Sequence, residues 1–313
     1  MIRIGMDVGG TGIQIGVVDE QGTILDKDSI RTRTDLPFEE QVKQMADCVK
    51  GLLRRGGYTE DDVASVGAGV PGVTYPGTGI IAFCTNLGWV DVPFRDEFQK
   101  HLNRPVFIDN DATVTGLAES VAGVSRGASS SVFMTLGTGV GGGIVINGKV
   151  WSGAHGIGSE IGHMTLEIDG EPCTCGKRGC MERYCSATAI IRMAKELIVN
   201  HPDSLIWELC GGDTGKISAK TVFDAAREGD VIAMRVFRRY VKYLSLAIYD
   251  IATFLDPEVI VLGGGVSKAG AFLLDAVREE MPKYAMYKTL PLPRVELAKL
   301  GPDAGIIGAA MLS

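Results

Sequence analysis

The sequence predicts an α/β protein built from two similar halves. Strand patterns alternate with helix patterns along 313 residues, a length that suits one large domain or two of ordinary size. A strand, a glycine-rich turn and a second strand stand near the N-terminus, and the same arrangement returns around residue 136. A repeated unit of this kind indicates two related half-molecules. We expect a small domain of residues 1–112, with a C-terminal helix (303–313) packing back onto it, and a large domain of residues 113–302.

The first half begins with two strands joined by a turn of almost bare backbone. Residues 2–7 are apolar, residues 13–17 alternate, and Gly9-Gly10-Thr11-Gly12 lies between them, as in a hairpin. A helix is predicted over residues 38–55, where apolar side chains recur at helical spacing. The remaining predicted elements are strands near 23–25, over 63–70 and over 105–109, and a helix over 112–122.

The second half repeats the glycine turn and then becomes helical. Strands over 130–136 and 142–146 flank the run Leu136–Gly143, LGTGVGGG. The long helix over 231–255 carries an apolar stripe and is stopped at Asp256-Pro257. We also expect helices over 187–199, 221–228, 269–280 and 305–312, a strand over 259–262 running into Gly263–Gly265, and an irregular connection over 201–214.

Composition excludes several classes of protein. A hydrophobic share of 45% with 22% charged residues is typical of a soluble globular chain. The net charge of −7 and a pI near 5.2 argue against nucleic-acid binding, which relies on a basic surface. The N-terminus lacks the features of a signal peptide, and no apolar run reaches membrane-spanning length. We therefore expect a cytoplasmic protein that binds neither nucleic acid nor membrane.

Three closely spaced cysteines and a histidine predict a zinc site. Cys173, Cys175 and Cys180 follow His163, with glycines and charged residues between them. Structural Zn²⁺ takes four thiolate and imidazole ligands in a tetrahedron, and this set completes it. The alternatives are cysteines packed as small apolar side chains or a disulfide between two of them. The lack of apolar periodicity and the polar residues between the cysteines favour zinc.

Three glycine turns, each following a strand, predict phosphate binding. Bare backbone N–H groups can approach phosphate oxygens closely, and Thr11 and Thr138 add hydroxyl donors. A glycine turn in a hairpin also has a purely structural explanation, so the argument depends on finding three. The turns comprise residues 7–12, 137–143 and 263–265.

The run Asp109-Asn110-Asp111 places acids where a strand ends and a helix begins. Asp111 could serve only as a helix cap, accepting a backbone N–H. It could instead be a general base facing a sugar hydroxyl, with Asn110 as a neutral hydrogen-bonding neighbour. Spacing alone leaves both readings open.

Together these motifs resemble the ROK family (repressor, open reading frame, kinase) of sugar kinases. The matching runs are Asp7-x-Gly9-Gly10-Thr11, the 136–143 turn, Glu160-x-Gly162-His163 and the cysteine run ending in Glu182, in the right order over essentially the whole chain. Within the family, Asn86-Leu87-Gly88-Trp89 and residues 217–230 are most similar to the bacterial glucokinases.

The resemblance implies an actin-like ATPase (ribonuclease H-like) fold of two α/β domains, with ATP and sugar bound in the cleft between them. It implies ATP-dependent phosphorylation of glucose at the 6-hydroxyl, with Asp111 as general base. His163 would give one ring nitrogen to zinc and the other to the sugar. The implied sugar ligands are Gly72, Asn86, Asn110, Asp111, Glu160, His163 and Glu182. The implied ATP and Mg²⁺ contacts are Asp7, Gly9, Gly10, Thr11, Gly137, Thr138, Gly139, Gly264 and Gly265.

Other readings stay open. The sugar could be N-acetylglucosamine, N-acetylmannosamine, mannose or fructose, and the donor could be ADP or polyphosphate. A sugar-responsive repressor is disfavoured by the acidic pI and by the six residues before Asp7, which leave no room for a DNA-binding domain. A homodimer is the expected assembly.

Overall fold

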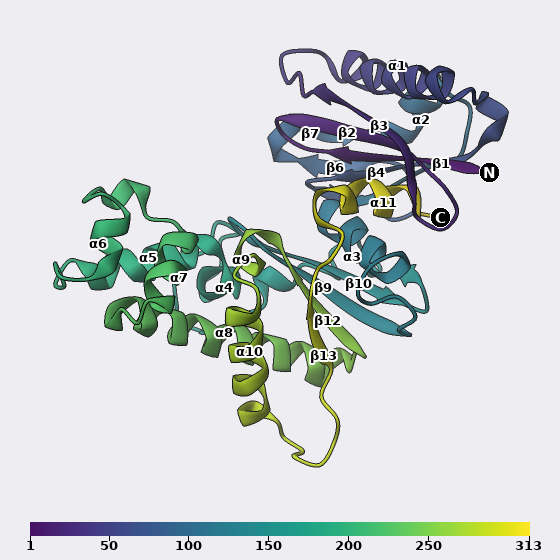
Figure 1. Cartoon of the computed structure of the whole chain (residues 1–313). Coiled ribbons are helices and arrows are strands. Elements are labelled where there is room, and N and C mark those ends of the chain that lie inside the picture. Colours follow the sequence, from purple (N-terminus) through teal and green to yellow (C-terminus); the bar gives the residue numbers. More distant parts are fainter. The chain divides into compact units, whose positions relative to one another are not determined.

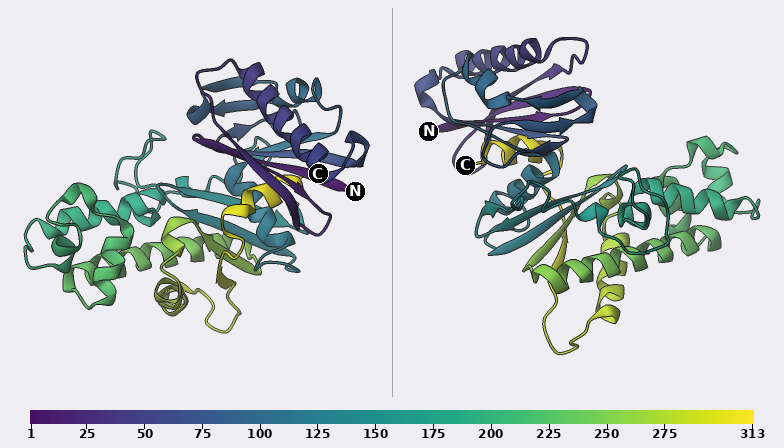
Figure 2. Two further views of the ribbon diagram at one scale, coloured as in Figure 1. Left: turned by 45° about the horizontal axis from the view of Figure 1, so that its top comes forward. Right: turned by 180° about the vertical axis from the view of Figure 1, so that it is seen from behind.

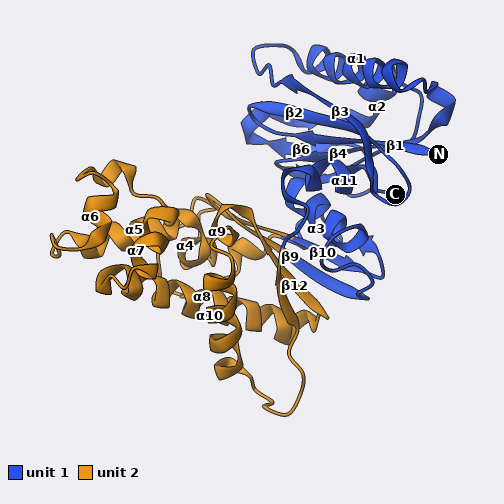
Figure 3. Ribbon diagram, in the orientation of Figure 1, with its two compact units in different colours: residues 1–133, 143–159, 298–313 blue, residues 134–142, 160–297 orange.

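The computed structural model describes residues 1–313, which separate into two compact units (Figure 3). Unit 1 comprises residues 1–133, 143–159 and 298–313, and unit 2 comprises residues 134–142 and 160–297. Neither unit is a single stretch of sequence. The division at residue 112 inferred from the sequence stays a prediction.

Unit 1 contains a mixed five-stranded sheet in the order β3-β2-β1-β4-β8. Strand β1 pairs antiparallel with β2 and parallel with β4, and β4 pairs parallel with β8. Helix α1 (Phe38–Gly56) covers one face of this sheet, and α11 (Ala304–Ala310) lies against the other (Figure 1). The strands are β1 (Ile2–Val8), β2 (Gly12–Val18), β3 (Ile24–Arg31), β4 (Val63–Val70) and β8 (Val106–Asn110).

Glycines let the backbone of α11 lie directly on this sheet. A Cβ atom on Gly5 would stand 1.9 Å from the carbonyl oxygen of Ile306, and one on Gly67 would stand 1.8 Å from that of Ala309. The segment just before α11 is held by the buried carboxylate of Glu119. This carboxylate accepts hydrogen bonds from the backbone N–H groups of Lys299 (2.8 Å) and Leu300 (3.0 Å). Backbone contact and a buried carboxylate therefore hold the C-terminal segment in unit 1.

A small antiparallel sheet, β5-β6-β7, and two further helices complete this half of the chain. The strands are β5 (Val73–Thr74), β6 (Ile81–Cys84) and β7 (Trp89–Val92), and the helices are α2 (Phe94–Gln99) and α3 (Asp111–Val121). None of the three strands, nor α2, was predicted. Their apolar runs are too short to show a period, and they are stabilised by pairing with one another and by packing of Trp89 and Phe94 in the core.

The second five-stranded sheet has the order β11-β10-β9-β12-β13, which repeats the order of the first sheet. The predicted duplication therefore appears in the topology. The strands are β9 (Ser130–Leu136), β10 (Val140–Ile146), β11 (Lys149–Val150), β12 (Val259–Gly263) and β13 (Arg294–Leu297).

Unit 2 is rich in helices, the longest of which is α8 (Val231–Leu255), seen from two further directions in Figure 2. Its apolar stripe packs against α5, α7 and α10. No helix combines the length and the apolar character needed to span a membrane. The other helices are α4 (Glu182–Cys185), α5 (Ala187–Ile198), α6 (Leu205–Leu209), α7 (Ala219–Arg227), α9 (Gly264–Ser267) and α10 (Ala271–Glu280).

Two sequence expectations need correction. Strand β3 extends to Arg31, well beyond the predicted residues 23–25. It is a mostly polar edge strand that is stabilised by pairing with β2, so no apolar pattern in the sequence marks its length. The connection over 201–214 is not irregular throughout, since it contains α6, which begins at the Ser204 cap.

Candidate functional site

The four predicted zinc ligands converge in unit 2. The ligand atoms of His163, Cys173, Cys175 and Cys180 all lie within 4.8 Å of one another. The Sγ atoms of Cys175 and Cys180 are 3.6 Å apart, and Cys173 Sγ is 3.7 Å from His163 Nδ1. Edges of about 3.8 Å are expected for thiolates around tetrahedral zinc, from the Zn–S bond of about 2.3 Å. The donor set fits zinc, and all seven cysteines are free, which excludes the disulfide alternative.

The cysteine loop folds tightly around this cluster. Gly176 and Gly179 have φ values of +89° and +71°, a region that favours glycine. A Cβ on Gly179 would lie 1.5 Å from the carbonyl oxygen of Glu167, so no other residue fits there. The ammonium of Lys177 donates to the carbonyl oxygen of His163 at 2.6 Å, which fastens the loop to the histidine.

The thiols differ in their proton affinity. A hydrogen bond from the Lys177 backbone N–H lowers the pKa of Cys175. Burial, with the neighbouring cysteines adding to it, raises the pKa of Cys180 to about 12. A divalent cation among the four ligands would favour the thiolate form of each cysteine, so metal affinity must rise with pH.

The two nitrogens of His163 face different partners. Nδ1 faces Cys173 in the cluster, and Nε2 lies 4.0 Å from Oε2 of Glu160. Both side chains are partly exposed, at 32% and 44%. The imidazole thus lies between the cysteine cluster and the accessible carboxylate of Glu160.

Glu182 lies against the second glycine turn. Its Oε2 accepts the backbone N–H of Val140 at 3.1 Å. A Cβ on Gly139 would stand 2.1 Å from the same oxygen, so glycine at this position makes room for the carboxylate. The turn is also tied to the start of α5, where Thr188 Oγ1 donates to the carbonyl oxygen of Thr138 at 2.7 Å. Sequence reasoning missed Thr188, although the nearby Ser186 helix cap marks this junction.

Gly264 and Gly265 follow β12 on the surface of unit 2. Gly264 has φ +82°, and a Cβ there would meet the backbone of Leu136 at 2.6 Å. The third glycine turn therefore lies directly against the strand that enters the second, and it exposes unobstructed backbone.

At the head of α3 in unit 1, Asn110 is the N-cap. Its Oδ1 accepts the N–H groups of Ala112 (2.9 Å) and Thr113 (3.3 Å), and its Nδ2 donates to the carbonyl oxygen of Gly72 at 3.1 Å. Asp111 is the first helical residue, and its Oδ1 also accepts the Ala112 N–H at 2.8 Å. Asn110 is therefore the N-cap, and Asp111, one residue further on, shares only the Ala112 N–H with it.

Asp7 lies at the end of β1, in the same unit as Asp111. Burial raises the pKa of Asp7 to about 6, and the charge of Asp111 adds to this shift. Two neighbouring carboxylates are stable together only when a proton or a cation offsets their repulsion. The pair therefore fits a site for Mg²⁺, whose preferred ligands are oxygen atoms.

The first glycine turn adjoins this pair. Gly9 donates its N–H to the carbonyl oxygen of Gly12 at 3.0 Å, while Gly10 and Thr11 are exposed. A Cβ on Gly10 would lie 3.3 Å from Cβ of Asn86. Unit 1 thus collects Asp7, this turn, Gly72, Asn86, Asn110 and Asp111. Unit 2 collects Glu160, His163, Glu182, residues 137–142 of the second turn and the third turn.

Comparison with known proteins places these residues in context. The ROK family profile matches residues 3–313. The chain is 39% identical to a glucokinase of Halalkalibacterium halodurans over 99% of this chain and 94% of the relative, and 32% identical to an N-acetyl-D-glucosamine kinase of Vibrio cholerae over 99% and 98%. A crystal structure of a ROK family glucokinase from Streptomyces griseus, in complex with glucose and AMPPNP, is similar with a TM-score of 0.80 and 34% identity, covering 99% of this chain and 98% of that one. The predicted two-domain actin-like ATPase fold is thereby confirmed.

Proposed function

The chain belongs to the ROK family, and on that premise we propose that it transfers the γ-phosphoryl group of ATP to the 6-hydroxyl of glucose. The 39% identity to a glucokinase over 99% of the chain carries the choice of substrate. The solved relative that holds glucose and AMPPNP supports the same pair of substrates.

Asp111 is the proposed general base. In phosphoryl transfer the protein contributes mainly positioning and charge neutralisation, and one group must accept the proton of the attacking hydroxyl. Asp111 stands at a helix start whose cap is already provided by Asn110. Its carboxylate would take the proton of the 6-hydroxyl as that oxygen attacks the γ-phosphorus in line.

The sugar's other hydroxyls need several acceptors and donors. We assign these roles to Asn110, Glu160, His163 and Glu182, with Gly72 and Asn86 contributing at the sugar's edge. Support comes from the restraint on two of these groups, since Asn110 is held at the start of α3 and Glu182 by the Val140 N–H. A preorganised ligand set loses little entropy on binding.

The zinc cluster has a positioning role in this proposal. When bound, zinc would be held by His163, Cys173, Cys175 and Cys180, and it would fix the histidine's orientation and tautomer. The Nε2 side of His163 is the side that faces Glu160, which leaves it for a sugar hydroxyl.

The glycine turns are the proposed phosphate and nucleoside contacts. These contacts are Gly9, Gly10, Thr11, Gly137, Thr138, Gly139, Gly264 and Gly265. The N–H groups of Gly9 and Gly137 close their own turns on Gly12 and Gly139. The other N–H groups and the two threonine hydroxyls would meet phosphate without adding positive charge. Asp7 would hold Mg²⁺, which when bound neutralises charge on the β- and γ-phosphates.

N-acetylglucosamine is the second candidate substrate, because the relative from V. cholerae covers 99% of this chain at 32% identity. A coupled assay of ADP release distinguishes the candidates, with glucose, N-acetylglucosamine, N-acetylmannosamine, mannose and fructose each tested at equal concentration. We expect the largest kcat/KM with glucose. A larger kcat/KM for an N-acetylated sugar would make that sugar the assigned substrate in place of glucose. If none of the five sugars were phosphorylated, the assignment as a kinase for these sugars would be wrong. Substituting ADP or polyphosphate for ATP tests the donor.

A further inference from the structure

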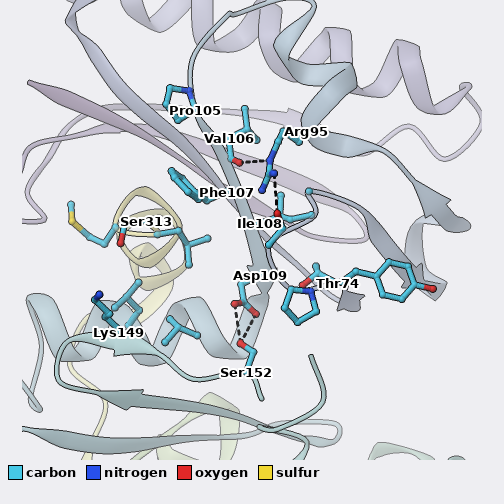
Figure 4. A pocket seen from close by; sticks show the side chains of 18 of the residues that line it. Thr74, Arg95, Pro105, Val106, Phe107, Ile108, Asp109, Lys149, Ser152 and Ser313 are labelled. Carbon is cyan, nitrogen blue, oxygen red and sulfur yellow. Dashed lines mark hydrogen bonds between the residues drawn. The ribbon is translucent and has the colours of Figure 1, made fainter. Parts of the chain in front are cut away.

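Unit 1 contains a cavity of about 1090 Å³ that none of the proposed catalytic or binding residues lines (Figure 4). It lies beside β8 and is bounded by the loop before β6, the segment after β11 and the C-terminus. Small-molecule sites commonly enclose about 300–1,000 Å³. The cavity therefore has room for a molecule larger than a single sugar ring.

Two polar side chains meet at its wall. The hydroxyl of Ser152 donates to the carboxylate of Asp109, at 3.0 and 3.3 Å from its two oxygens, and Figure 4 shows the two groups pointing toward each other. Burial raises the pKa of Asp109. Side chains on a strand alternate, so Asp109 faces this cavity while Asn110 turns to Gly72. The catalytic proposal uses Asn110 and leaves Asp109 without a role.

The charges around the cavity are balanced or already engaged. Arg95 donates to the carbonyl oxygens of Val106 (2.9 Å) and Gly77 (3.1 Å), and Arg104 is paired with Asp61. Lys149 and Asp109, which carry opposite charges, both line the cavity. With both arginines engaged by protein groups, the lining has no cluster of free cations to select an anion, and it favours a neutral polar molecule.

Apolar side chains make up much of the remaining wall, among them Phe107, Trp151 and Leu312. Trp151 is 43% exposed, so part of its ring is accessible. A ligand with hydroxyl groups along its edge and C–H groups on its face can hydrogen-bond to the polar part of the wall and pack against the apolar part. Saccharides have this chemistry, and aromatic side chains offer a flat surface to the C–H face.

We propose that this cavity is a second saccharide site, which takes a neutral sugar of disaccharide size or larger through Asp109 and Ser152. The inference goes beyond the proposed function, because its residues are separate from those assigned to phosphoryl transfer. The two can fail independently of each other.

Titration calorimetry on the full chain tests the proposal, with maltose and trehalose as neutral probes and glucose 6-phosphate as the anionic probe. Glucose and AMPPNP are added at saturation so that the catalytic residues are occupied. We expect one saturable site per chain for at least one disaccharide. Asp109→Ala should weaken that binding at least tenfold and Ser152→Ala severalfold. Asp47→Ala, on the exposed face of α1, should leave it unchanged.

Several outcomes would overturn the proposal. They are no saturable binding of either disaccharide, tighter binding of glucose 6-phosphate than of both disaccharides, and equal affinity in the Asp109→Ala and unsubstituted chains. Thermal melting confirms that each variant is folded, and Ser152→Ala, which removes a single hydroxyl, carries the test if Asp109→Ala is unstable. Disaccharide binding that depends on Asp109 would stand even if glucose proved not to be a substrate.

Discussion

The charge of Asp111 adds to the effect of burial in raising the pKa of Asp7, although more than a hundred residues separate the two acids in the sequence. Repulsion between two acids is tolerated in a folded protein where it serves binding or catalysis. Asp7 is largely buried, so its unfavourable charge is not relieved by water. The pair is the part of unit 1 whose electrostatics most clearly indicate a site.

Replacing the proposed base should stop turnover with little effect on folding. Asp111→Asn keeps the shape of the side chain and removes its ability to accept a proton. We expect kcat to fall by at least about a hundredfold, the low end for general-base catalysis, with the sugar KM changed only a few-fold. Steady-state kinetics measure both constants. Asp47→Asn, an exposed substitution on α1, is the control, and near-normal turnover in Asp111→Asn would reduce Asp111 to a structural residue.

Asp7 should make stability depend on pH. Its pKa is about 6 in the folded chain, against about 3.9 for an unperturbed Asp. Because the folded state binds this proton more tightly, its stabilisation is complete below about pH 4 and is lost as pH rises through about 6. At about 1.4 kcal/mol per pKa unit, the loss is at most about 3 kcal/mol.

The measurement compares urea unfolding of the unsubstituted chain and Asp7→Asn from pH 4 to pH 7 without added Mg²⁺. Asp7→Asn should gain relative stability as the pH rises, and added Mg²⁺ should reduce that gain. A stability difference that does not change with pH would contradict the assigned pKa.

The cysteine cluster should hold about one zinc ion per chain. Cys175→Ala removes one of four ligands, so elemental analysis should show most of the zinc lost, and the sugar KM should rise because His163 is no longer fixed. Cys48→Ala, outside the cluster on α1, is the matched control. The positioning role fails if Cys175→Ala retains both its zinc and its sugar affinity.

Two glycines in one turn offer a paired test of Glu182. A methyl group at Gly139 would collide with the Glu182 carboxylate at 2.1 Å, whereas one at Gly137 meets nothing within 4 Å. We expect Gly139→Ala to raise the sugar KM at least several-fold by displacing Glu182, and Gly137→Ala to have a much smaller effect on it. Equal KM values in the two variants would argue against a sugar-binding role for Glu182.

The features predictable from sequence were those written in short stretches. The hairpin around Gly9–Gly12, the long stripe of α8 and the cysteine run all carry their signal within a few turns or a single loop. Strands β5, β6 and β7 escaped because their stability comes from pairing and core packing that no short pattern records. The Asp109–Ser152 contact spans 43 residues, and only the folded chain brings the two together.

The site shows the same limit. His163 and the cysteines could be grouped by spacing, but the contact of Glu182 with Gly139 and Val140 joins residues about forty positions apart. Asn110 and Asp111 are adjacent in the sequence, and either could cap the helix that follows. Only the hydrogen bonds of the folded chain show that Asn110 is the N-cap. The individual roles proposed for these residues stay predictions.

The placement of α11 also bears on how the protein is made. Its backbone fills the space that Gly5 and Gly67 leave open on the first sheet, so a segment that follows unit 2 in the sequence completes a sheet whose strands precede unit 2. While the ribosome is still translating unit 2, only α3 lies on that sheet face, and the part that α11 will cover exposes apolar surface. A chain truncated before Ala304 should therefore aggregate during synthesis, although it would contain every residue proposed for substrate binding.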